Sequence, residues 1–241
     1  MKNPCRLVSL FFALGSFALH AQEPHTYSMR QSLSVFAEYS NTSSHVILGV
    51  TQNRRLTALG LAYSRRLLHT QYADWYYAPE LLPFALIQDP VANLTVNSSA
   101  GTFSESTPSV SACRPAVIVV QPNPGSGFSG YTVTRTCSTR STYAGGLSPL
   151  GQRINFIPHS RIQPFVIGNA GFLVAPRDIP VNDSSRFNFT FEFGAGIEFF
   201  HDHHHSWSAE YRIHHLSNDY TGNNNPGIDN QIVKVTYSFG R

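Results

Sequence analysis

The chain has 241 residues, of which 41% are apolar, 12% aromatic and only 13% charged, with 17 Lys and Arg against 14 Asp and Glu. Soluble domains carry about 25% charged residues, so disorder driven by excess charge is excluded. After the N-terminal segment, no apolar run approaches the roughly 18 residues of a membrane-spanning helix, which excludes a helical membrane bundle. The net charge of +3 is not gathered into a basic stripe, so nucleic acid is not expected as a partner.

Residues 1–21 have the pattern of a secretory signal peptide. Two positive residues precede an apolar stretch over residues 7–19, and a small-residue cleavage site lies before Gln22. Export would leave the chain with two cysteines, Cys113 and Cys137, in a compartment where they can oxidise. We therefore expect residues 1–21 to be removed and Cys113 to form a disulfide with Cys137.

The remaining chain is predicted to be a series of β-strands. Residues 22–43 contain a short alternating segment, Leu33–Tyr39, and we interpret them as an N-terminal extension or a broken first strand. From residue 44 to 241, strands are expected near residues 45–51, 56–67, 72–87, 143–155, 161–173, 187–199, 205–217 and 228–240. A long polar insertion at residues 88–142 separates the third strand from the fourth.

The strand at residues 187–199 shows the clearest alternation. Apolar residues occupy its odd positions, while Asn, Thr, Gly and Glu occupy the even ones. The last two strands repeat this pattern, and charged residues such as Glu192 and Arg212 fall on the even face. Strands of about 10 to 13 residues with an aromatic face exceed the five or six typical of soluble sheets and suit a membrane barrel. The sequence therefore predicts an all-β fold, an eight-stranded antiparallel transmembrane β-barrel with a long extracellular loop.

Connection lengths predict the orientation of this barrel. The connections at 174–186 and 218–227 are long, whereas those at 156–160 and 200–204 are short. Outer-membrane barrels have short periplasmic turns and long extracellular loops. We therefore expect an outer-membrane protein of a Gram-negative-type envelope, surrounded by outer-membrane lipids, with residues 88–142 outside the cell. An even strand number is the rule for such barrels, which is why Leu33–Tyr39 is left out of the count.

A group of polar residues near the C-terminus has the composition of a nucleophilic site. His215 and Ser217 are two positions apart on a predicted strand, so they share a face with Cα atoms about 6.5 Å apart. A serine nucleophile with an imidazole base needs a third group, usually a carboxylate, and Asp229 begins the next strand. All three positions are odd, which places them on the outer, lipid-facing side at the extracellular rim.

These residues resemble the motif of a known family. His215-Leu-Ser-Asn218, followed by Asn225-Pro-Gly-Ile-Asp229, is similar to the His-x-Ser-Asn motif of outer-membrane lipid A 3-O-deacylases, the PagL-like acyloxyacyl hydrolases, in which an acid follows 12 residues after the serine. The resemblance implies a serine esterase that hydrolyses the 3-O-linked hydroxyacyl ester of lipid A in lipopolysaccharide, without a cofactor. It also implies Ser217 as the nucleophile, His215 as the general base, Asp229 as the orienting acid and Asn218 as an oxyanion donor.

The chain departs from the family pattern in two places. Asp229 is one methylene shorter than the Glu of the best-known members, so a small strand shift or a bridging water would be needed to join it to His215. Asp219 and Tyr220 replace the small residues expected after Ser-Asn, where a backbone amide would complete the oxyanion site.

Two other interpretations remain open at this point. A non-catalytic outer-membrane barrel for adhesion or envelope integrity would use residues 88–142 as its binding element. The histidines at 201 and 203–205 could form a periplasm-facing metal site, since imidazoles bind zinc and nickel. We interpret them as a solvated turn and expect no metal. The sequence leaves a homodimer open.

Overall fold

The computed structural model describes residues 26–241 of the chain, so the expected signal peptide at 1–21 lies outside the described residues. The described part is almost entirely β-structure. Its strands are β1 (Gln31–Ser40), β2 (Arg55–His69), β3 (Ala73–Tyr77), β4 (Glu80–Ser98), β5 (Gly101–Pro108), β6 (Ala116–Val120), β7 (Tyr131–Ser148), β8 (Gln152–Phe156), β9 (Ile162–Ile179), β10 (Ser185–Phe200), β11 (His205–Ser217) and β12 (Ile228–Gly240), with one short 3-10 helix, η1 (Pro124–Ser126). None of the helical segments described is long and apolar enough to cross a membrane.

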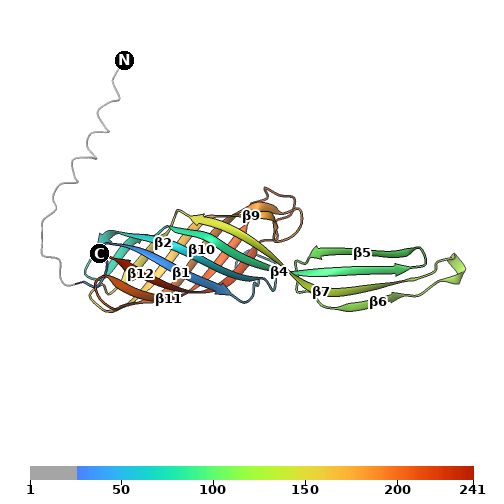
Figure 1. Ribbon diagram of the computed structural model, residues 1–241, viewed down its shortest axis with the longest axis horizontal. Helices are drawn as coiled ribbons and strands as arrows, with labels where there is room; N and C mark the ends of the chain where they lie inside the picture. The colour runs from blue at the N-terminus through green and yellow to red at the C-terminus, as the bar shows by residue number, and fades with distance from the viewer. Residues whose placement is uncertain (1–25) are drawn as a thin grey trace, which may run out of the picture.

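The strands close into an eight-position antiparallel barrel (Figure 1). β1 pairs with β2 on one side and with β12 on the other, which completes the ring. Two positions of the ring are each shared by two strands, β3 with β4 and β8 with β7. The predicted eight-stranded barrel is therefore confirmed.

The first strand of the barrel lies earlier in the chain than the sequence pattern predicted. Leu33–Tyr39 forms part of β1, paired along its length with β2 and β12, whereas residues 45–51 form a loop. The barrel still has eight strand positions, because β1 takes the place of the strand expected at residues 45–51. The alternation of Val46, Leu48 and Val50 reflects exposed side chains on a loop and not a ladder.

The two ends of the barrel differ in their connections. We call the end with the short connections, residues 70–72, 157–161 and 201–204, the turn end. The opposite end, with residues 41–54, 180–184 and 218–227, is called the loop end. The connection expected at 174–186 is shorter than predicted, because β9 continues to Ile179 and β10 begins at Ser185. The C-terminus lies at the turn end (Figure 1).

Prolines divide the two shared positions of the ring. The expected strands at 72–87 and 143–155 are interrupted at Pro79 and Pro149, which have no N–H to donate to a ladder. The two interruptions lie side by side, because Ala78 N donates to Gly151 O at 2.9 Å. A Cβ on Gly151 would lie 1.8 Å from Ala78 O, so only glycine permits this approach.

The predicted faces of the C-terminal strands are confirmed. The odd-numbered Phe side chains of β10 are exposed on the outside, while Glu192 and Arg212 are buried in the interior. Arg212 bonds Glu80 at 2.7 Å, Glu192 at 2.8 Å and Glu210 at 2.9 Å. The barrel interior is thus filled by paired charges in its middle.

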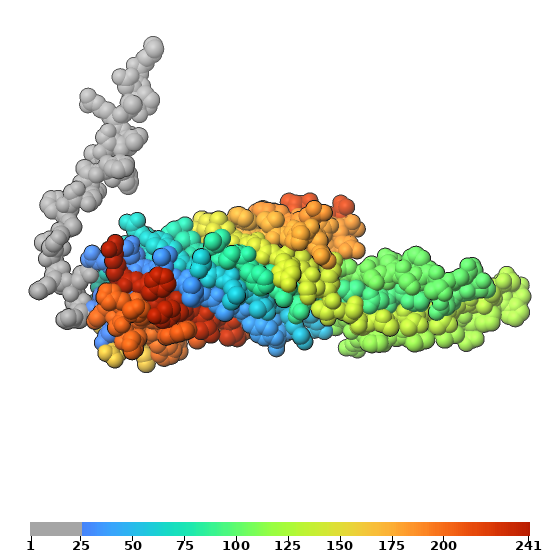
Figure 2. Space-filling model, in the orientation of Figure 1, coloured from blue at the N-terminus to red at the C-terminus, as the bar shows by residue number. Residues whose placement is uncertain are grey.

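Residues 88–142 form a sheet and not an irregular loop. β4 and β7 continue out of the barrel wall as one ladder, from Glu80 opposite Ser148 to Ser98 opposite Tyr131. β5 pairs with β4 and β6 pairs with β7, which gives a four-stranded sheet in the order β5-β4-β7-β6. We call it the projecting sheet, and it extends well beyond the loop end (Figures 1 and 2).

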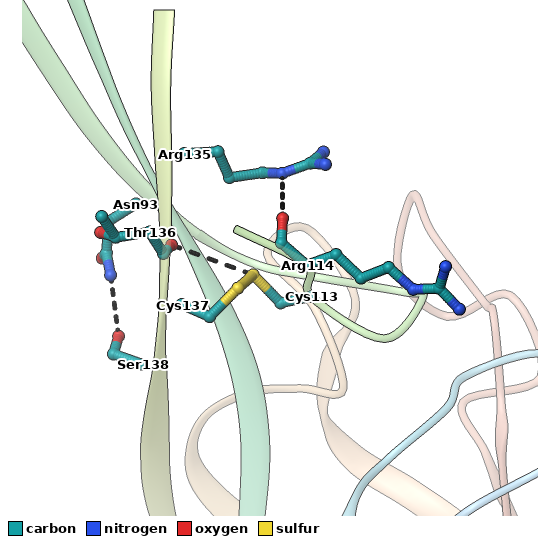
Figure 3. Close-up of a disulfide and its surroundings, with 7 residues drawn as sticks. All are labelled: Asn93, Cys113, Arg114, Arg135, Thr136, Cys137 and Ser138. Carbon is teal, nitrogen blue, oxygen red and sulfur yellow. Dashed lines mark hydrogen bonds between the residues drawn. A yellow bond between two sulfur atoms is a disulfide. The ribbon is translucent and has the colours of Figure 1, made fainter. Parts of the chain in front are cut away.

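The predicted disulfide lies in this sheet. Cys113, just before β6, is bonded to Cys137 on β7. Nearby, Arg135 Nε donates to Arg114 O at 2.7 Å, and Asn93 Nδ2 donates to Ser138 Oγ at 3.0 Å (Figure 3). The disulfide and these bonds fasten the β6 edge and β4 to β7.

Candidate functional site

His215 and Asp229 meet at the loop end of the barrel. The ladder between β11 and β12 places them directly opposite each other. His215 Nδ1 lies 2.6 Å from Asp229 Oδ1, which is a short hydrogen bond between an imidazole and a carboxylate. The shorter Asp side chain therefore reaches the imidazole directly, and neither the strand shift nor the bridging water considered from the sequence is needed.

The second oxygen of Asp229 is held by backbone amides. Oδ2 accepts N–H bonds from Val46 at 3.0 Å, Ile47 at 2.5 Å, Leu48 at 3.1 Å and Gly49 at 3.0 Å. Successive amides that converge on one anion form a nest, which favours negative charge. The Asp229 side chain is 0% exposed, while that of His215 is 14% exposed. The acid is therefore buried with both of its oxygens bonded.

The loop that supplies these amides is fastened to the start of β12. Ser44 N donates to Asp229 O at 3.1 Å, and Val50 N donates to Pro226 O at 2.8 Å. Thr51 Oγ1 donates to Gly227 O at 2.6 Å. Sequence reasoning missed this loop because backbone amides carry no residue signature.

Gly227 brings the β11–β12 connection against the imidazole. Its φ of +59° lies in the left-handed region. A Cβ there would lie 3.3 Å from His215 Cε1 and 3.2 Å from the Cα of Gly49. The glycine of the sequence motif thus serves close packing around His215.

Ser217 is the last residue of β11, two positions beyond His215 on the same outward face, and it is half-buried. It lies opposite Phe189 of β10. Within residues 26–241 its hydroxyl has no hydrogen-bond partner, so it is not bonded to His215 in this conformation. With Nδ1 bonded to Asp229, Nε2 is the imidazole atom left for Ser217; catalytic hydrogen bonds often tighten only when substrate binds.

Asn218 is bonded within the loop that follows β11. Its Nδ2 donates to Asn224 O at 2.8 Å, and its Oδ1 accepts from Tyr220 N at 2.9 Å. Asp219 and Tyr220 both have positive φ, which the bonds of Asn218 hold in place. Asn218 therefore holds its own loop in place, and the Tyr220 amide donates to Asn218 Oδ1. One hydrogen of the Asn218 carboxamide remains for another acceptor.

The site rests on a packed interior. Leu216, Ile228 and Ile232, which alternate with the outward residues, are buried in an apolar cluster within the barrel. The strands that carry the outward side chains at 215, 217 and 229 are therefore held in place by the packing of their inward residues.

The histidine turn is bonded to Thr26 and to Gly240 near the C-terminus. His203 Nδ1 lies 3.0 Å from Thr26 O, and His204 Nδ1 lies 2.9 Å from Gly240 O. Bonds from the His205 side chain and from the amide of His204 lower the pKa of Asp202 to about 2. No group of three or more His, Cys, Asp or Glu in residues 26–241 is arranged to hold a metal ion.

The chain is similar to a known protein family and to solved outer-membrane barrels. The profile of the family described as lipid A 3-O-deacylase (PagL) matches residues 122–238. A crystal structure of the outer membrane enzyme PagL aligns with a TM-score of 0.52 and 14% identity over 84% of this chain and 97% of that chain. Ail, the attachment invasion locus protein of Yersinia pestis, aligns with a TM-score of 0.36 and 9% identity, over 88% of this chain and 100% of its own. LpxR from Salmonella typhimurium aligns with a TM-score of 0.25 and 7% identity, over 87% of this chain and 100% of its own. A search of curated proteins gives no significant match.

Proposed function

We propose that this chain is a lipid A 3-O-deacylase of the outer membrane, the family whose profile matches residues 122–238, and that Ser217, His215 and Asp229 carry out its ester hydrolysis. The observation that supports this assignment is the direct bond between His215 Nδ1 and Asp229 Oδ1 on the outward face of the barrel. A buried carboxylate fixes the tautomer of the imidazole, so that Nε2 can accept the proton of a serine hydroxyl.

In the proposed reaction Ser217 Oγ attacks the carbonyl carbon of the 3-O-linked hydroxyacyl ester, and His215 Nε2 accepts the hydroxyl proton. The imidazolium then gives this proton to the leaving sugar oxygen, and an acyl-serine ester remains. A water molecule, deprotonated by His215, hydrolyses this ester and releases the hydroxy fatty acid. Asp229 stays ionised throughout and stabilises the imidazolium.

Asn218 is the proposed oxyanion donor. Its carboxamide uses one hydrogen for Asn224 O, which fixes its orientation. The residue is only 1% exposed, so its second hydrogen would reach the negative oxygen of the intermediate once residues 218–225 shift on substrate binding. The amide of Tyr220 donates to Asn218 Oδ1 and so supports the donor without contacting the oxyanion itself.

The location of the site fits a lipid substrate. His215 and Ser217 face outward at the loop end, beside the band of exposed Phe side chains on β10, with Ser217 opposite Phe189 and His215 opposite Phe191. An acyl chain that lies along this band would place its ester near the rim. One chain supplies all the proposed groups, so the chemistry does not require the homodimer that the sequence left open.

The decisive experiment is mass spectrometry of lipid A from cells that express the wild-type chain or Ser217→Ala. Wild-type cells should lose one hydroxyacyl chain from lipid A, and Ser217→Ala cells should lose none. Equal amounts of folded barrel in the two strains provide the control. Deacylation by Ser217→Ala would show that another residue is the nucleophile.

A further inference from the structure

We propose that residues 46–49 are the positioning element of the catalytic acid: their four amides hold Asp229 Oδ2 so that Oδ1 faces His215. The proposal rests on the catalytic assignment above and adds residues that no sequence motif marks. Val46, Ile47, Leu48 and Gly49 act here through their backbone, because it is the N–H groups that contact the carboxylate.

The two oxygens of Asp229 have separate partners. Oδ1 lies against His215 Nδ1, while Oδ2 takes all four amides. A carboxylate bonded only through Oδ1 could rotate about its Cβ–Cγ bond and present either oxygen to the imidazole. The nest prevents this rotation, since turning the group would break four charge-assisted bonds.

The loop also replaces water around a buried charge. Asp229 belongs to the outward face of β12, where the neighbouring odd positions Val233 and Val235 are exposed. Asp229 itself is 0% exposed because residues 44–51 cover it. Without the loop this carboxylate would be solvated, and its oxygens would be free to exchange partners.

Gly49 is the residue that allows the loop of residues 44–51 to pack closely over Asp229. A Cβ at this position would lie 2.6 Å from Asp229 N, 2.7 Å from Ile228 C and 2.9 Å from Asp229 Oδ1. The φ of Gly49 is not positive, so alanine can adopt its backbone conformation. The effect of Gly49→Ala would therefore come from displacement of the loop, and not from backbone strain.

The test measures kcat and KM of the refolded full chain on lipid A in vesicles. Gly49→Ala should lower kcat by about 100-fold, since a misplacement of about 1 Å has this effect on a catalytic group, while KM stays close to the wild-type value. Gly125→Ala is the matched control, because a Cβ there would meet only Asn123 Oδ1 at 3.5 Å. An unchanged kcat for Gly49→Ala would overturn the proposal.

A second variant covers the case in which Gly49→Ala does not fold. Leu48→Pro removes one of the four amide donors at a side chain that is 71% exposed. It should lower kcat with little effect on KM. A folded Leu48→Pro with wild-type kcat would also overturn the proposal.

Two further measurements test whether Gly49 acts through Asp229. In an Asp229→Asn background, Gly49→Ala should cause no further loss of kcat, because the acid that the loop positions is already gone. A second full loss in that background would show that Gly49 acts elsewhere. The far-downfield proton resonance of the His215–Asp229 bond should weaken in Gly49→Ala and persist in Gly125→Ala. Its persistence in Gly49→Ala would count against the proposal.

The outcomes separate this proposal from the catalytic assignment. Deacylation by Ser217→Ala would refute the assignment. An inactive Ser217→Ala together with a fully active Gly49→Ala would leave the assignment in place and refute the positioning role.

Discussion

At the scale of single residues, the site depends on short side chains placed by close backbone contacts. Asp229 reaches His215 at 2.6 Å, and the glycines at 49 and 227 allow the surrounding loops to pack against this pair. A glutamate at 229 would need more room in the nest. The short acid and the tight loop are therefore matched to each other.

Asp229→Asn tests the role of the acid. The Asn oxygen can still accept amide bonds from the loop, but its NH2 group would donate to Nδ1 and favour the wrong imidazole tautomer. We expect kcat to fall by about 10⁴-fold, as for the corresponding change in the serine protease template, with the barrel still folded. Deacylation rates on lipid A and the heat-dependent gel mobility of the barrel measure the two effects. Wild-type activity of Asp229→Asn would mean that another residue orients His215.

Several residues of the site could be predicted from sequence, and others could not. The spacing and parity of His215, Ser217 and Asp229 predicted a shared face, and the strand faces on which this prediction rests are confirmed. The amides of residues 46–49 could not be foreseen, since any residue except proline supplies an N–H. The role of Asn218 in its own loop likewise depends on the folded path of residues 218–225.

At the scale of elements, the bounds of strongly alternating strands were predictable, whereas the pairing of the first strand and the strands without a buried face were not. β11 and β12 have the predicted bounds, because alternation is strong and polar loops limit them. The choice between β1 and the segment 45–51 depended on which of them pairs with β12, a contact nearly 200 residues away along the chain. The projecting sheet was missed because it is a single layer exposed on both faces, which leaves no periodic apolar signal.

Removal of the projecting sheet tests the adhesion interpretation. Residues 92–137 would be replaced by Asn-Gly, a dipeptide suited to a two-residue hairpin turn, at a point where Ala92 and Cys137 are paired, so that both cysteines of the disulfide are removed. The ion pairs of Asp89 with Arg54 and Arg140 remain in this variant. We expect a folded barrel and lipid A deacylation within about twofold of wild type in cells. An adhesin would instead lose cell attachment with this variant and keep it with Ser217→Ala.

At the scale of the whole molecule, the barrel interior holds paired charges beside its apolar cluster, while the exterior carries mostly apolar side chains. Arg212 lies among three glutamates, and Lys234 bonds Glu80 at 2.5 Å. These charged residues lie on four different strands, β4, β10, β11 and β12, so the network links opposite walls of the barrel. The charged side chains of this network are thus buried inside the barrel, where no lipid reaches them.

Arg212→Met tests this network. The change removes the partner of Glu192 and Glu210 and leaves their charges buried, so we expect a loss of about 3 to 5 kcal/mol in the free energy of unfolding. Arg186→Met is the control, because its side chain is 71% exposed and its ion pair with Asp178 is loose, at 3.8 Å. Urea midpoints of the folded barrel in detergent measure both variants. Equal midpoints for the two would show that the interior network does not stabilise the barrel.

The outward direction of His215 and Ser217 determines how substrate can arrive. A site inside the barrel would have to draw lipid through the wall, whereas the proposed site borders the leaflet in which the lipid would lie. Encounters then occur by lateral diffusion in two dimensions, and the quantity that governs their frequency is the mole fraction of substrate in the leaflet. Dilution of a cell suspension leaves that fraction unchanged, so the working concentration of the site is set by the composition of its own membrane.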